Sequence, residues 1–177
     1  MEDKPANEII NRVDQSGIKS LDLEVLYDHH ERITLDIKDQ LFQGMILREK
    51  DFREFVKTHD WQKYQGKNVA ITCSADAIVP TWAFMLIATR LGGMAHHFVF
   101  GSPEDLEQSL FQKALDTLDW KAFENQNVVV KGCSDVPVPV FAYVETVRRL
   151  RPLAKKIMYG EPCSTVPLYK KEIPDSR

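Results

Sequence analysis

Three cysteines are the residues of this chain best suited to chemistry, because each stands at the same place in a repeated pattern. Cys73, Cys133 and Cys163 are each followed by serine, and each comes after a stretch with the character of a strand. Together with Gly101-Ser102, these pairs recur at intervals of 28, 32 and 30 residues, which is the length of a strand and its crossover helix. The recurrence predicts that each thiol lies just past the carboxyl end of a strand.

Thiols at three neighbouring strand ends would make a site for a soft cation. Parallel strands end at one edge of their sheet, so the three thiols are expected to face one crevice. Nearby helix N-termini stabilise thiolates, and thiolates bind zinc or an iron–sulfur cluster. Both usually take four ligands, so a fourth ligand is needed from Asp76, Glu161, a histidine, water or a partner.

The histidines fit this edge less well than the two acidic residues. His96 and His97 stand at the start of a predicted strand, which is the opposite end of the sheet, so we expect them to be structural or exposed. His29 and His30 lie in an N-terminal segment that can fold over the carboxyl edge. The predicted metal ligands are therefore the three cysteines with Asp76 and Glu161.

The elements that must position these residues follow from the hydrophobic pattern. Apolar runs alternate with amphipathic stretches from residue 67 onward, which predicts strands joined by helices in a mainly parallel sheet. The expected strands are Val69–Thr72, His97–Phe100, Asn127–Lys131 and Lys156–Tyr159, and helices follow the first three. Before them, a strand is expected at Ile33–Ile37 and a helix over 47–57, while 41–46 fits either a strand or an earlier start of that helix.

The predicted fold is a three-layer α/β domain with a mainly parallel, doubly wound sheet of order 2-1-3-4. Residues 1–177 are expected to form a single domain, because no Pro/Ser-rich linker divides the chain. Within it, residues 1–66 form an N-terminal αβ segment and residues 67–171 form the parallel βα units. In this strand order the three strands that carry cysteine are neighbours.

Composition excludes several classes of function. The 177 residues carry 23 basic and 26 acidic side chains and a formal charge of -3, so nucleic acid is not an expected partner. No apolar stretch approaches the length of a membrane span, and the N-terminus does not resemble a secretory signal. We therefore expect a cytoplasmic protein with reduced thiols. Nothing in the composition indicates the oligomeric state.

Longer strings of the sequence resemble a known family. Residues Leu47–Phe55, Thr72–Ala83, Lys131–Ser134 and Tyr159–Tyr169 look like those of the bacterial family named domain of unknown function 2480, and the similarity covers about residues 9–171. The resemblance implies no established activity. Members of that family are often encoded near iron–sulfur cluster assembly genes, so the resemblance implies a thiol or metal role and iron–sulfur assembly proteins as partners.

Three functional hypotheses follow from these observations. The first is a cytosolic accessory protein that handles metal or iron–sulfur clusters through the three-cysteine site at the carboxyl edge of the sheet. Its expected process is iron–sulfur cluster assembly. The second is a thiol enzyme in which one cysteine accepts sulfur or an acyl group and another resolves it. The third is an adaptor without catalytic activity, in which the cysteines only fill space in the core.

Overall fold

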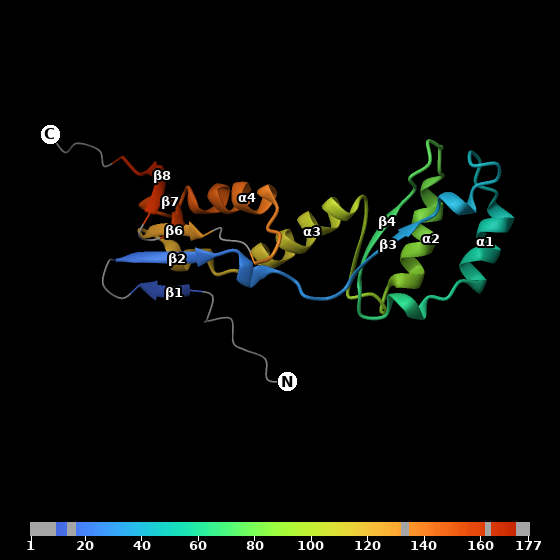
Figure 1. The fold of residues 1–177 in the computed structure, drawn as a ribbon, viewed down its shortest axis with the longest axis horizontal. Coiled ribbons are helices and arrows are strands. Elements are labelled where there is room, and N and C mark those ends of the chain that lie inside the picture. Colours follow the sequence, from blue (N-terminus) through green and yellow to red (C-terminus); the bar gives the residue numbers. More distant parts are fainter. Residues whose placement is uncertain (1–9, 14–16, 132–134, 162–163, 173–177) are drawn as a thin grey trace. The chain divides into compact units, whose positions relative to one another are not determined.

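A computed structural model describes residues 10–13, 17–131, 135–161 and 164–172 of the chain (Figure 1). Its elements divide between two compact units. Unit 1 contains residues 1–27 and 111–177, and unit 2 contains residues 28–110, so the sequence of unit 2 is inserted into that of unit 1. The prediction of a single domain stays a prediction, because the compactness of two parts does not decide whether they unfold together.

Unit 2 is built on a sheet of three parallel strands in the order β3-β4-β5. The strands are β3 (Arg32–Asp36), β4 (Asn68–Thr72) and β5 (His97–Phe100). Arg32 pairs with Asn68, and Asn68 pairs with His97, so the three strands begin level with one another. The segments that lead into these strands therefore meet at the amino edge of the sheet.

The core of unit 2 joins this sheet to helices α1 (Glu49–Thr58) and α2 (Thr81–Leu91) (Figure 1). Phe52 of α1 is fully buried in this core. Trp61 and Tyr64 belong to the same cluster, so they pack their segment against the sheet. The ambiguous segment 41–46 is neither a strand nor the start of α1, since it forms a turn closed by a single bridge between Phe42 and Ile46.

A reciprocal cap between Ser102 and Asp105 begins helix α3 (Pro103–Asp116). The Ser102 hydroxyl accepts a hydrogen bond from the Asp105 N–H at 3.2 Å, and the Asp105 carboxylate accepts one from the Ser102 N–H at 2.8 Å. Gly101 precedes the cap with a φ of +148°, and a Cβ at this position would lie 2.5 Å from the Asp105 carboxylate. The cap therefore requires glycine at residue 101.

Unit 1 is built on a five-stranded sheet in the order β1-β2-β6-β7-β8. Its strands are β1 (Ile10–Val13), β2 (Ile18–Asp22), β6 (Asn127–Lys131), β7 (Lys156–Glu161) and β8 (Ser164–Lys170). Strands β2, β6 and β7 are parallel, and the two outer strands are antiparallel to their neighbours. Helix α4 (Val140–Leu150) contributes to the core together with the buried residues Phe111 and Phe123. No helix in the described ranges is both long and apolar enough to cross a membrane.

The predicted class, an α/β fold with mainly parallel sheets, is confirmed, but the single sheet of order 2-1-3-4 is wrong. Strands β4 and β5 pair in unit 2, whereas β6 and β7 pair in unit 1. The physical reason is that the N-terminal strands β2 and β3 take the places beside β6 and β4. The first 66 residues therefore supply strands to both sheets and are not a segment packed on one sheet.

The two units repeat one arrangement at a constant offset in the sequence. Strands β4 and β6 begin at residues 68 and 127, helices α2 and α4 at 81 and 140, and strands β5 and β7 at 97 and 156, so each counterpart lies 59 residues further on. The packing repeats as well. Phe84 lies edge-on to Phe100 with ring centroids 4.6 Å apart, and their counterparts Tyr143 and Tyr159 lie edge-on at 5.8 Å. Residues of unit 2 thus have identifiable counterparts in unit 1.

Candidate metal centre

The amino edge of the unit 2 sheet brings together two chain segments that are distant in sequence. One segment leads into β3 and contains Asp28 and His30, and the other leads into β5 and ends near His96. Main-chain hydrogen bonds fix both segments to the start of β4. The Asn68 N–H donates to the Glu31 carbonyl at 2.8 Å, and the His96 N–H donates to the Lys67 carbonyl at 2.9 Å. The level start of the three strands is therefore what places these side chains side by side.

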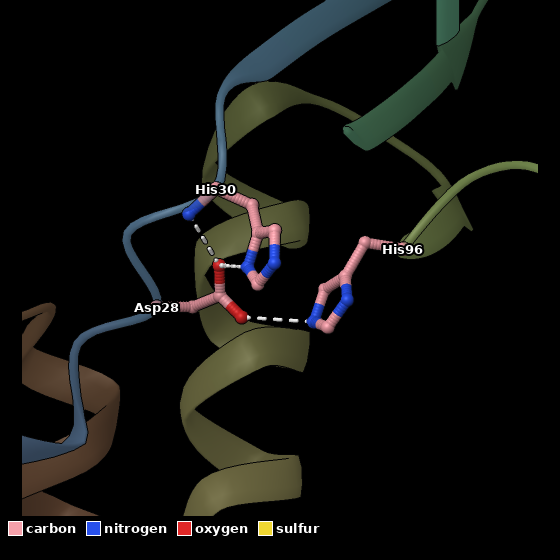
Figure 2. A group of neighbouring side chains, drawn as sticks. All are labelled: Asp28, His30 and His96. Atoms are coloured by element: carbon pink, nitrogen blue, oxygen red, sulfur yellow. Dashed lines mark hydrogen bonds and ion pairs between the residues drawn. The ribbon is translucent and has the colours of Figure 1, made fainter. Parts of the chain in front are cut away.

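Asp28, His30 and His96 each offer one potential ligand atom, and these atoms all lie within 4.8 Å of one another. Figure 2 shows the two carboxylate oxygens of Asp28 joined to different imidazoles. His30 Nδ1 is 2.9 Å from Asp28 Oδ1, and His96 Nε2 is 3.1 Å from Asp28 Oδ2. The two imidazole rings are stacked, with centroids 3.7 Å apart and planes inclined by 12°. Two imidazoles and one carboxylate thus form a compact group.

The Asp28 carboxylate is held in its charged form. Burial alone would raise the pKa of Asp28, but hydrogen bonds from the His30 main chain, the Asn68 side chain and the His30 imidazole outweigh burial and lower the pKa to about 2. Asp28 is therefore an anion at neutral pH and well into the acidic range. An anionic carboxylate beside two imidazoles is the protonation state that a metal ion requires of this ligand.

Asn68 supports the carboxylate from below the surface. Its side chain is fully buried at the first position of β4, and its amide nitrogen donates to Asp28 Oδ1 at 2.8 Å. The Asn68 Oδ1 atom is buried and accepts no hydrogen bond within the part of the chain that is described. A buried amide in contact with the carboxylate restricts the direction in which Asp28 points.

The distances in this group suit coordination of one small ion. At metal–ligand bonds of about 2.0–2.1 Å, two ligand atoms of one ion are separated by roughly 2.9–3.4 Å for octahedral or tetrahedral angles. His30 Nδ1 and His96 Nε2 lie 2.9 and 3.1 Å from different oxygens of Asp28, and one ligand atom from each residue lies within 4.8 Å of the others, so a single ion would draw the three atoms closer together. The His30, His96 and Asp28 side chains are 49%, 33% and 20% exposed, so solvent reaches the group. Such a group can hold an ion and leave positions open for water or another ligand.

The strands that precede the three cysteines do not belong to one sheet. Cys73 follows β4 in unit 2 and is half-buried, with its thiol 4.0 Å from the Ala75 carbonyl. Asp76 is exposed in the same loop. Cys133 and Cys163 lie outside the described residues, and the strands that precede them belong to the sheet of unit 1. The premise that all three cysteines follow strands of one sheet is therefore wrong, and the three-cysteine ligand set stays a prediction.

Glu161 lies at the end of β7 in unit 1, where it has a basic neighbour. Its carboxylate oxygen Oε2 is 3.5 Å from Nζ of Lys131, the last residue of β6. The predicted ligands Asp76 and Glu161 thus belong to different units, Asp76 to unit 2 and Glu161 to unit 1. Their role as metal ligands stays a prediction.

The sequence alone identifies this group only in part, since no motif points to Asp28. The sequence allows the His30 segment to fold over the carboxyl edge, but the structure places His30 before β3 at the amino edge. The predicted position of His96 at the amino end of its strand is confirmed. The sequence does contain an Asp-x-His spacing, Asp28 to His30, before one strand and His96 before another. This combination points to a site only when the two strands are known to begin level with each other.

A comparison with protein-family models finds a match over most of the chain. Residues 7–171 match the model of a family described as "Protein of unknown function (DUF2480)", which is nearly the full length of the chain. No curated protein and no solved structure matches the chain. The geometry of the site therefore carries the functional argument.

Proposed function

The chain belongs to the DUF2480 family, and for this member we propose a metal-handling function in which Asp28, His30 and His96 bind a divalent first-row transition-metal ion. The observation that carries the proposal is the convergence of two imidazoles and one ionised carboxylate within 4.8 Å. A cytoplasmic location and an accessory role in metal supply belong to the same proposal.

The ligand types favour one class of ion. Imidazole nitrogen suits zinc, iron, nickel and copper, whereas calcium and magnesium prefer oxygen ligands. One carboxylate offsets part of the charge of a divalent ion, and three protein ligands leave at least one position for water. Main-chain hydrogen bonds and strand pairing hold the ligand-bearing segments without an ion. We therefore expect an exchangeable or catalytic ion and not one that the fold requires.

A Co²⁺ titration tests the proposal. Protein treated with a chelator and then desalted is expected to bind about one equivalent of Co²⁺ at neutral pH, with visible absorption bands that Zn²⁺ abolishes by competition. The matched control is His29→Ala, which removes an exposed histidine adjacent to His30 but outside the clustered group. Absence of saturable binding in the wild-type protein and in the control would refute the proposed function.

A second proposal keeps a role for thiols in unit 1. Cys133 and Cys163 each stand two residues beyond the end of a strand, and these strands, β6 and β7, are hydrogen-bonded neighbours. The ion pair between Lys131 and Glu161 supports the proximity of the two strand ends. The strands that precede the two thiols are thus adjacent in the sheet of unit 1. For these thiols we propose sulfur transfer or, with ligands from a partner, binding of zinc or an iron–sulfur cluster.

Mild oxidation with diamide followed by alkylation distinguishes this pair from the third cysteine. Each disulfide formed releases two protons and two electrons, which reduce diamide to the hydrazine. Peptide mass spectrometry is expected to show Cys133 joined to Cys163 within one chain, with Cys73 alkylated. The same pair is expected in Cys73→Ser. A disulfide that includes Cys73, or retention of three free thiols, would contradict the paired-thiol proposal.

A further inference from the structure

We infer that Arg32, clamped by Glu107, is a positioning residue that presets the metal-ligand loop, an inference that rests on the proposed function of Asp28, His30 and His96. Arg32 is the first residue of β3, directly after the ligand-bearing segment, and Glu107 lies on α3. Neither residue belongs to the group of potential ligands. Their proposed role is to fix the main chain from which two of the three ligands project.

The Arg32 guanidinium makes contacts in two directions. Its Nη1 atom donates to the main-chain carbonyl of Asp28 and, at 2.7 Å, to that of His30. Its Nε and Nη2 atoms donate to the two carboxylate oxygens of Glu107 at 2.7 and 3.1 Å. One rigid side chain therefore joins the main chain of both ligand residues to a fixed point on helix α3.

The geometry of arginine is necessary for this clamp. A planar guanidinium offers donors in a fixed fork, so it can pair with a carboxylate on one side and with carbonyls on the other. A lysine ammonium carries the same charge on a flexible stem and cannot span these acceptors in one orientation. The pair is also shielded, since the Arg32 and Glu107 side chains are only 22% and 23% exposed. Arg32→Lys thus removes the positioning while the positive charge near the ion is retained.

The clamp works together with the buried support of the carboxylate. Asn68 fixes the direction of the Asp28 side chain, and Arg32 fixes the main chain on both sides of His29. The third ligand, His96, is attached separately through its main-chain bond to Lys67. A loop that loses the clamp has to be ordered when the ion binds, so its affinity for the ion should fall although every ligand remains.

The test compares Co²⁺ binding by the wild-type protein, Arg32→Lys and a matched control, Arg53→Lys. Arg53 lies in the same unit and pairs with Glu49 on α1 at 2.8 Å, with both side chains largely exposed. We expect Arg32→Lys to lower Co²⁺ affinity about 10–100-fold with one equivalent still bound at saturation, and Arg53→Lys to bind as the wild type does. The Co²⁺ absorption spectrum is recorded at saturation, because altered ligand geometry shifts its bands whereas a remote loss of stability does not.

The results distinguish a failure of the positioning role of Arg32 from a failure of the metal site itself. Affinity and spectrum of Arg32→Lys equal to those of the wild type would overturn the positioning role and leave the metal site intact. Absence of binding by the wild type would overturn both. If Arg32→Lys does not fold, Glu107→Gln provides the measurement, since it weakens the clamp from the helix side and is expected to lower affinity in the same direction.

Discussion

Replacement of His96 by alanine is expected to weaken the binding of Co²⁺ or Zn²⁺ by at least about 100-fold. The substitution removes one of three ligand atoms and puts no donor in its place, while Asp28 and His30 remain on their own segment. With only Asp28 and His30 left to bind it, the ion is held by one short segment and dissociates more readily than from the three-ligand site. The effect is measured by competition with a chromophoric chelator at neutral pH.

Two controls separate loss of a ligand from general damage. His29→Ala removes a neighbouring exposed histidine, and Lys155→Ala alters the counterpart of His96 in unit 1, 59 residues further on. Both variants are expected to bind the ion as the wild type does. Wild-type affinity in His96→Ala would rule out the assigned ligand set. Because the pKa of Asp28 is lowered to about 2, this carboxylate is still an anion at pH 4, so protonation of Asp28 is not expected to release the ion at that pH.

Phe52→Ala is expected to lower the free energy of unfolding by about 3–5 kcal/mol. The Phe52 side chain is fully buried on α1 and lies edge-on to Trp82 of α2, with ring centroids 5.8 Å apart. Its truncation removes a large apolar side chain and leaves a cavity between α1 and α2. Urea denaturation followed by circular dichroism measures the loss.

The matched control for this variant is Met85→Ala on α2, where the side chain is 64% exposed and the expected change is within about 0.5 kcal/mol. Phe123→Ala applies an equivalent truncation to the core of unit 1, since Phe123 is 1% exposed. The single-domain prediction requires one unfolding transition that both core variants shift. Two resolved transitions, with Phe52→Ala affecting only one of them, would refute it.

The local elements of the fold could be predicted because their signals are local. The strand at 127–131 contains three consecutive valines, and the start of α3 is specified by Ser102 and Asp105, whose reciprocal hydrogen bonds are observed. Strand partners could not be predicted in this way. The pairing of β2 with β6 joins residues over a hundred positions apart, and nothing in either segment alone encodes the choice.

The candidate site was missed for a related reason. In open α/β folds chemistry usually lies at the carboxyl edge of the sheet, and His96 precedes its strand at the opposite edge. Its neighbour in space, Asp28, precedes a strand that was not assigned to the parallel sheet. Once β3, β4 and β5 are seen to begin level, the Asp28–His30 segment and His96 must meet. Knowledge of strand register was the missing information.

The repeated arrangement of the two units carries different side chains at several matching positions, 59 residues apart. Asn68 has Asn127 as its counterpart, but His96 corresponds to Lys155, and the phenylalanine pair at 84 and 100 corresponds to the tyrosine pair at 143 and 159. Asparagine at the first position of the central strand is thus common to both units, whereas the histidine and the aromatic pair differ. The two units therefore offer an internal comparison, in which a side chain present in only one unit is not required by the shared arrangement.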